Sequence, residues 1–114
     1  MTDEFSPLSV QDYASQALTT DQRSDGGSLA FPLLGLFGET GSLLSEVKKK
    51  QRDRASYLGY AAAVVDELGD VLWYLTAVAA RGGLSLSDIA GNLSRGYSDW
   101  QRAPDTALSF ASLQ

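Results

Sequence analysis

The most strongly patterned stretch of the chain is residues 57–83, which read YLGYAAAVVDELGDVLWYLTAVAARGG. Its apolar residues recur every three or four positions, which is the period of one face of an α-helix. They are Leu58, Ala61, Ala62, Val65, Leu68, Leu72, Leu75 and Ala79. Gly82 and Gly83 end the pattern, and Arg81 stands in the last turn, where a cation favours the helix dipole. The stretch predicts one long helix from about Tyr57 to Arg81.

Three further helices are predicted from start signals and helical spacing. Their expected ranges are about 9–20, 29–50 and 88–100. Ser9 is followed three residues later by an acid, in the manner of a capping box. Pro32 suits the first turn of the second helix, and Ser87 is expected to cap the last one. Because no segment reads as a strand, the expected fold is all-α, with four helices joined by short loops.

Length and charge narrow the class of protein. The 114 residues suit one small domain, 1–114, with a core at about 29–100 and a tail at 101–114. No apolar run approaches the roughly 20 residues of a membrane span, and the acidic N-terminus is unlike a signal peptide. A net charge of −5 argues against broad nucleic-acid binding. We therefore expect no membrane and no nucleic-acid partner, and the lack of Cys fits a cytoplasmic location.

The chain contains no His and no Cys. Their absence excludes disulfides, thiolate zinc sites, cysteine nucleophiles, Ser-His-Asp triads and histidine-bound metals. Any catalysis must therefore use carboxylates, hydroxyls, lysine, arginine and a bound hard cation.

Carboxylates are spaced along two of the predicted helices so that each set shares a face. Glu39 and Glu46 lie seven residues apart with Ser42 between them, and Glu67 and Asp70 lie three apart. If the two helices pack antiparallel, the four acids meet in one cleft. Crowded carboxylates either raise their pKa values or bind a cation, and oxygen ligands favour Mg²⁺ or Mn²⁺. The alternative is that these acids lie on solvated helix faces, as most helical acids do.

Two blocks carry a resemblance to a known family. Residues 35–53, GLFGETGSLLSEVKKKQRD, and residues 66–97, DELGDVLWYLTAVAARGGLSLSDIAGNLSRGY, resemble the MazG-like all-α nucleoside triphosphate pyrophosphohydrolases. That family holds Mg²⁺ with a Glu-x-x-Glu motif on one helix and Glu-x-x-Asp on the next. The resemblance implies a MazG-like bundle, completed by oligomerisation as a homodimer or homotetramer. A domain of this size also gains from association, since alone it buries only about two thirds of its unfolded surface.

The second acidic motif is complete, whereas the first departs from the family pattern. Glu67 and Asp70 match Glu-x-x-Asp, and Glu39 matches the first acid of the other motif. Ser42 stands where the second Glu is expected, and its hydroxyl is a poorer Mg²⁺ ligand than a carboxylate. Glu46, one turn further on, could supply the missing charge, or could instead pair with a lysine four residues later, Lys50.

Candidate substrate contacts lie outside the acidic motifs. Five bases, Lys48, Lys49, Lys50, Arg52 and Arg54, fall together, and most suit a solvated helix end. Lys49 is our choice among them for a phosphate contact. The resemblance adds Asn92 and Arg95, which match the family's Asn-x-x-Lys segment near the substrate phosphates, with Arg replacing Lys. Tyr74 could hydrogen-bond to a phosphate or sugar, whereas Trp73 and Phe37 are expected to pack rather than stack on a base.

The function implied is Mg²⁺-dependent pyrophosphohydrolysis of an NTP or dNTP to the monophosphate and pyrophosphate, with Mn²⁺ as a substitute cation. Its expected metal ligands are Glu39, Glu46, Glu67 and Asp70, and either Glu39 or Glu46 would orient the attacking water. Two alternatives stay open. One is a non-catalytic nucleotide-binding or helical interaction relative weakened by Ser42. The other is a phosphoribosyl-ATP pyrophosphohydrolase of similar build.

Overall fold

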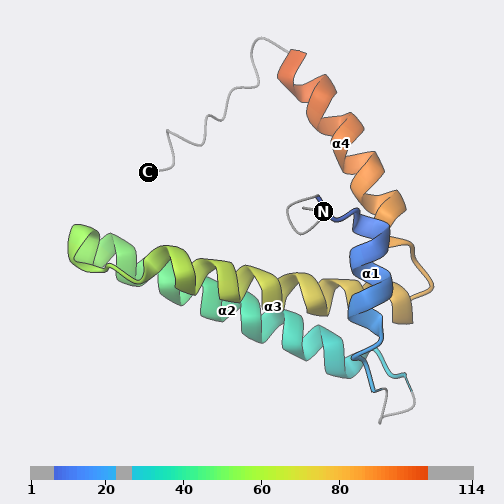
Figure 1. The fold of residues 1–114 in the computed structure, drawn as a ribbon, viewed down its shortest axis with the longest axis horizontal. Coiled ribbons are helices and arrows are strands. Elements are labelled where there is room, and N and C mark those ends of the chain that lie inside the picture. Colours follow the sequence, from blue (N-terminus) through green and yellow to red (C-terminus); the bar gives the residue numbers. More distant parts are fainter. Residues whose placement is uncertain (1–6, 23–26, 103–114) are drawn as a thin grey trace, which may run out of the picture.

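The structure is a computed structural model that describes residues 7–22 and 27–102, with side chains as far as residue 96. Four α-helices follow one another (Figure 1), and no strand occurs in these ranges. They are α1 (Val10–Leu18), α2 (Ala30–Asp53), α3 (Tyr60–Arg81) and α4 (Leu86–Arg102), with a 3₁₀ turn, η2 (Arg54–Ser56), between α2 and α3. The expected all-α fold with four helices is confirmed. The predicted tail lies mostly outside the described residues.

Helices α2 and α3 form an antiparallel hairpin that is the longest feature of the fold (Figure 1). Residues that face the seam are half-buried and recur at helical spacing along both helices. On α2 they include Leu36, Glu39, Leu43, Glu46 and Val47, and on α3 they include Tyr60, Ala63, Val64, Glu67, Val71 and Tyr74. The hairpin therefore brings acidic and apolar side chains together in one seam, as the spacing of the carboxylates predicts.

Helix α1 packs across the C-terminal half of α3, where the buried residues of the domain gather. The described residues that are buried are Pro32, Thr76, Ala77, Ala79 and Leu86. Two polar contacts fasten the end of α1 to this region. The indole Nε1 of Trp73 donates to Oγ1 of Thr20 at 2.8 Å, and Arg81 forms a 2.6 Å ion pair with Asp21. Trp73 therefore packs within the chain, as expected.

The ends of the helices differ from the predicted ranges for local reasons. Helix α4 begins at Leu86, because the Oγ of Ser85 accepts the backbone N–H of Asp88 at 3.2 Å. The predicted cap, Ser87, was wrong, and it lies inside the first turn. Helix α2 runs to Asp53, where the positive φ of Arg54 (50°) ends it.

Much of the apolar stripe that predicts α3 is exposed to solvent in the single chain. Leu58 is 92% exposed and Val65 68%, and Leu68, Leu72 and Leu75 are also exposed. The half-buried face of α3 is instead the neighbouring one that carries Glu67. A contiguous exposed apolar face of this kind is typical of an interaction surface.

The glycines of α2 have different surroundings. A Cβ built on Gly35 would lie 2.0 Å from Cε1 of Tyr74, so this glycine permits the close approach of the Tyr74 ring. At Gly38 and Gly41 a Cβ would meet nothing within 4 Å. Of these three glycines, only Gly35 is closely approached by a residue of the neighbouring helix. None of the helices in the described ranges is both long and apolar enough to span a membrane.

Candidate functional site

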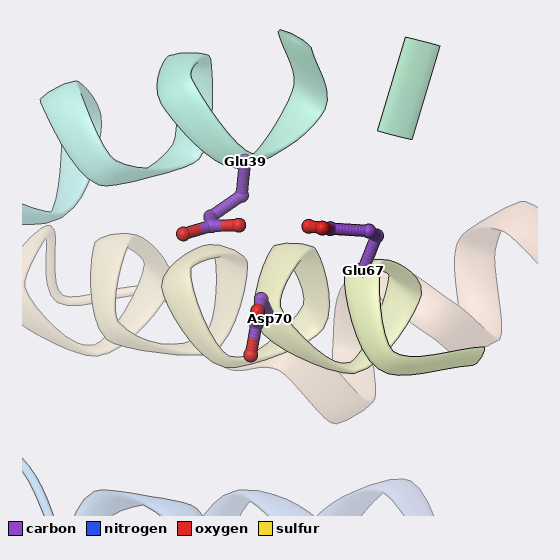
Figure 2. A group of neighbouring side chains, drawn as sticks. All are labelled: Glu39, Glu67 and Asp70. Carbon is purple, nitrogen blue, oxygen red and sulfur yellow. The ribbon is translucent and has the colours of Figure 1, made fainter. Parts of the chain in front are cut away.

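Three carboxylates meet between α2 and α3. Glu39 extends from α2, and Glu67 and Asp70 extend from α3 (Figure 2). Each offers an oxygen atom that lies within 4.8 Å of the corresponding oxygens of the other two. Glu39 and Glu67 are half-buried and Asp70 is exposed. We call these three residues the acidic cluster, and its open side is the side of Asp70.

Helix geometry explains why these three side chains converge. Glu67 and Asp70 are three residues apart and therefore share one face of α3. Glu39 lies on the half-buried face of α2 that packs against it. Gly38 and Gly69, which are next in sequence to Glu39 and Asp70, are exposed, and a Cβ built on either would meet no neighbouring element within 4 Å.

The acidic cluster places three like charges close together. Burial raises the pKa of Glu67, and a hydrogen bond with Glu39 and the negative charges of Glu39, Asp70 and Glu46 raise it further. Oε2 of Glu67 is buried and has no hydrogen-bond partner among the described residues. An orphaned buried carboxylate oxygen is costly, and a divalent cation would satisfy it. Three oxygen donors suit Mg²⁺ or Mn²⁺, so the residues present fit that group.

Glu46 lies outside the acidic cluster and has partners of its own. Its Oε2 accepts a hydrogen bond from the hydroxyl of Tyr57, and its Oε1 forms a 3.1 Å ion pair with Nζ of Lys49. These bonds, led by that from Tyr57, hold the pKa of Glu46 below its usual value. The lysine partner is therefore Lys49, three residues on, in place of Lys50, which was one of the two alternatives for Glu46. Nζ of Lys50 lies instead 5.6 Å from the ring centroid of Tyr60.

The hydroxyl of Ser42 is bonded to its own helix. Its Oγ donates to the carbonyl oxygen of Gly38 at 3.3 Å. Back-bonding of this kind is usual for serine inside a helix. Position 42 therefore contributes no carboxylate, and its hydroxyl proton is already used.

The predicted substrate contacts are not gathered around the acidic cluster in the single chain. Tyr74 packs against Gly35 and makes edge-on ring contacts with Phe31 and Trp73, at centroid distances of 6.0 and 5.1 Å. Its ring is therefore part of the packing of α2 on α3. Lys49 pairs with Glu46, as described above.

Asn92 and Arg95 lie exposed on α4, where the Arg95 guanidinium donates to the Asn92 side-chain oxygen. In the described part of the chain α4 packs on α1 and α3 but not on α2 (Figure 1). The hairpin thus unites Glu39, Glu67 and Asp70 and leaves this pair on another element.

Tyr57 is a feature of the site that sequence reasoning missed. It was expected to begin the third helix, but it lies in the turn before α3 and bonds to Glu46. Helical periodicity carries no signal for this contact, because it depends on the path of the turn.

The comparisons with known proteins agree with the geometry. The family model described as "MazG nucleotide pyrophosphohydrolase domain" matches residues 31–102, more than half of the chain. The match spans α2, α3 and α4, and it includes all three residues of the acidic cluster. No curated protein and no solved structure gives a match. Since the family model covers most of the chain, the protein belongs to the MazG nucleotide pyrophosphohydrolase family.

Proposed function

We propose that the chain hydrolyses an NTP or dNTP to the monophosphate and pyrophosphate, with Mg²⁺ as cofactor and Mn²⁺ as a substitute. The single observation that carries the proposal is the buried Oε2 of Glu67, which has no hydrogen-bond partner within the described residues and belongs to a side chain that meets Glu39 and Asp70 in the acidic cluster. Family membership supports a nucleotide substrate. The absence of His and Cys from the sequence agrees with chemistry that rests on oxygen ligands.

In this proposal Glu39, Glu67 and Asp70 hold the cation. When bound, it would neutralise charge on the phosphates and so permit an acidic protein to accept a polyanion. Glu39 or Glu46 orients a water molecule towards the α-phosphorus and accepts its proton. The bond from that phosphorus to the bridging oxygen breaks, and pyrophosphate leaves.

The phosphate contacts are assigned to Lys49, Tyr74, Asn92 and Arg95 and stay predictions. Lys49 is the cation that pairs with Glu46, and its side chain is half exposed at 48%. Asn92 and Arg95 would come from a second copy, because α4 does not pack on α2 of its own chain. Tyr74 would contribute its hydroxyl, since its ring is packed against Gly35.

We propose a homodimer or homotetramer as the working form. The exposed apolar residues of α3 and α4 support this, because isolated monomers rarely expose so much apolar surface. They include Val65, Leu68, Leu72, Leu75, Ile89 and Leu93, and Leu58 in the turn before α3 is also exposed. Light scattering coupled to gel filtration tests this, and a mass near 12.2 kDa would contradict it. The single-domain organisation and the cytoplasmic location also stay predictions.

One alternative is favoured by a specific observation. Because Ser42 stands where the second acid is expected, the first acidic motif lacks one carboxylate, and the Ser42 hydroxyl donates its proton to Gly38. A relative that binds nucleotides without turnover, or that acts as a helical interaction module, would be consistent with that loss. Phosphoribosyl-ATP is retained as an alternative substrate of the enzyme.

Pyrophosphate release measured across NTPs, dNTPs and phosphoribosyl-ATP separates these functions. The proposal expects release with at least one NTP or dNTP in Mg²⁺ or Mn²⁺, and none in EDTA. Release from phosphoribosyl-ATP alone would favour the alternative enzyme. Nucleotide binding without release would favour the non-catalytic relative, and neither release nor metal binding would exclude the enzyme.

A further inference from the structure

Tyr57 reaches from one end of the hairpin to an acidic side chain on the neighbouring helix. Its hydroxyl donates to Oε2 of Glu46, eleven residues earlier in the chain. Oε1 of the same carboxylate is bound by Lys49 at 3.1 Å. The Glu46 side chain is only 13% exposed. Both oxygens of this carboxylate are therefore held by donors from two different elements.

The turn that precedes α3 is built so as to deliver Tyr57. Arg54 adopts φ 50° and ψ −125°, a conformation that L-residues rarely take and that persists only where surrounding contacts hold it. The backbone N–H of Tyr57 donates to the carbonyl of Arg54 at 3.2 Å. The Tyr57 ring packs edge-on against Tyr60 at a centroid distance of 5.8 Å. The phenol is thus fixed from its backbone and from its ring.

The two donors hold the Glu46 side chain in one position. A free glutamate side chain would lose considerable conformational entropy on being held in that way. Hydrogen bonds to a charged group are among the stronger ones in proteins. Each carboxylate oxygen has two lone pairs. Glu46 therefore keeps acceptor capacity for a water or a cation after both donors are bound.

Glu46 lies on the same helix face as one member of the acidic cluster, and its charge acts on another. It follows Glu39 by seven residues on the same half-buried face of α2, and its charge contributes to the environment of Glu67. Ser42, between them, carries no charge and is bonded to its own helix. Glu46 is thus the remaining acid of α2 at the seam.

Resting on the proposed function, we propose that Tyr57 is a positioning residue that holds Glu46 as the replacement for the carboxylate missing at position 42. Glu46 then lies at the edge of the acidic cluster, where it orients the attacking water and supports binding of the cation by the other three acids. Tyr57 touches neither substrate nor cation and acts through Glu46 alone.

The test compares Tyr57→Phe, Glu46→Gln and the double variant, with Tyr60→Phe as the matched control. Phenylalanine keeps the ring against Tyr60 and removes only the hydroxyl. We expect Tyr57→Phe to lower kcat about tenfold, the lower end for residues that orient a metal site, with KM within twofold. The same change in the Glu46→Gln background should cost nothing further. Tyr60→Phe should leave kcat unchanged.

A rescue variant separates positioning from a purely structural contact. Adding Ser42→Glu to Tyr57→Phe restores the motif acid, so kcat should return to within about twofold of the original protein. A Tyr57 hydroxyl that only stabilised the turn before α3 would give different results. Tyr57→Phe would then lower kcat by the same factor with Glu46 or Gln present, and Ser42→Glu would not restore it. Either of these two results overturns the proposal.

Mn²⁺ binding, followed by the loss of the free-ion signal in electron paramagnetic resonance, keeps this proposal distinct from the proposed function. If the original protein releases no pyrophosphate, the proposed function fails. Tyr57→Phe should still weaken Mn²⁺ binding by about tenfold, and only where Glu46 is present. Unchanged Mn²⁺ affinity together with unchanged kcat in Tyr57→Phe would refute the positioning role.

Discussion

Replacing Arg81 by Met removes one half of an ion pair that joins the end of α3 to the segment after α1. The guanidinium donates from Nη2 to Oδ1 of Asp21 at 2.6 Å and from Nε to Oδ2 at 3.1 Å. It also lies over the ring of Phe31, with its central carbon 5.6 Å from the ring centroid. Methionine keeps much of the apolar stem and loses the charge.

The magnitude follows from how completely the pair is buried. The side chains of Arg81 and Asp21 are 1% and 2% exposed, so solvent does not screen them. Removing one member of a buried ion pair costs about 3–5 kcal/mol. At roughly 2.1 cal/mol/K per residue the unfolding entropy of 114 residues is about 0.24 kcal/mol/K, so the unfolding midpoint should fall by about 12–20 °C.

Circular dichroism during thermal unfolding measures this shift, and the chain provides its own control. Arg52 also pairs with an aspartate, Asp53, but its side chain is 65% exposed. Arg52→Met should therefore leave the midpoint almost unchanged. The reasoning would be refuted if Arg81→Met shifted the midpoint no more than Arg52→Met does. The double variant Asp21→Asn, Arg81→Met should lower the unfolding midpoint no further than the more damaging single variant, because the two side chains contribute through one shared interaction.

Three further predictions concern the hairpin. Gly35→Ala should destabilise the fold, because its Cβ would lie 2.0 Å from a ring carbon of Tyr74. The Cβ of Gly69→Ala would meet nothing within 4 Å, so this variant should stabilise the fold by about 1 kcal/mol. Arg54→Gly should stabilise by about 1 kcal/mol, since glycine adopts a φ of 50° without strain. Because folding raises the pKa of Glu67 from its ordinary value of 4.5, stability without a cation should fall as pH rises through that raised pKa.

Thermal unfolding checks all three predictions. For Glu67 the sign is decided by proton binding: the folded protein holds this proton more tightly than the unfolded chain, so the stabilisation is complete below pH 4.5 and is lost above the raised pKa. Mg²⁺ favours the ionised carboxylate, so its stabilising effect should be larger at pH 8 than at pH 5. An equal stabilisation by Mg²⁺ at pH 5 and pH 8 would contradict the prediction for Glu67. An equal change in stability for Gly35→Ala and Gly69→Ala would contradict the prediction for the glycines.

The hairpin and the acidic cluster follow from residue spacing. Glu67 and Asp70 share a helix face by the geometry of the α-helix, and an antiparallel neighbour brings Glu39 to them. The spacing could not separate Glu46 from these three, because all four acids occupy equivalent faces. Glu46 is instead bonded to Tyr57, which follows the unusual backbone of Arg54 in the turn before α3.

Other features depend on contacts that periodicity does not encode. Arg81 was interpreted as a cation that suits the end of a helix, but it pairs with Asp21, sixty residues earlier in the chain. The apolar stripe of α3 predicts a helix correctly and does not say which surface covers it. In the single chain Leu68 and Leu72 remain exposed. A stripe looks the same in the sequence whether its own chain or a second copy buries it.

Pyrophosphate release during a Mg²⁺ titration, compared between the original protein and Glu67→Gln, tests the central claim that the acidic cluster holds the cation used in catalysis. The variant keeps the shape of the Glu67 side chain and removes the charge of the carboxylate that contains the unpaired Oε2. The account predicts Mg²⁺-dependent release by the original protein. Pyrophosphate release by the folded variant should fall by more than the roughly 10–100-fold that is typical when a residue only supports metal ligands. Equal release by both proteins over the same Mg²⁺ range would contradict it.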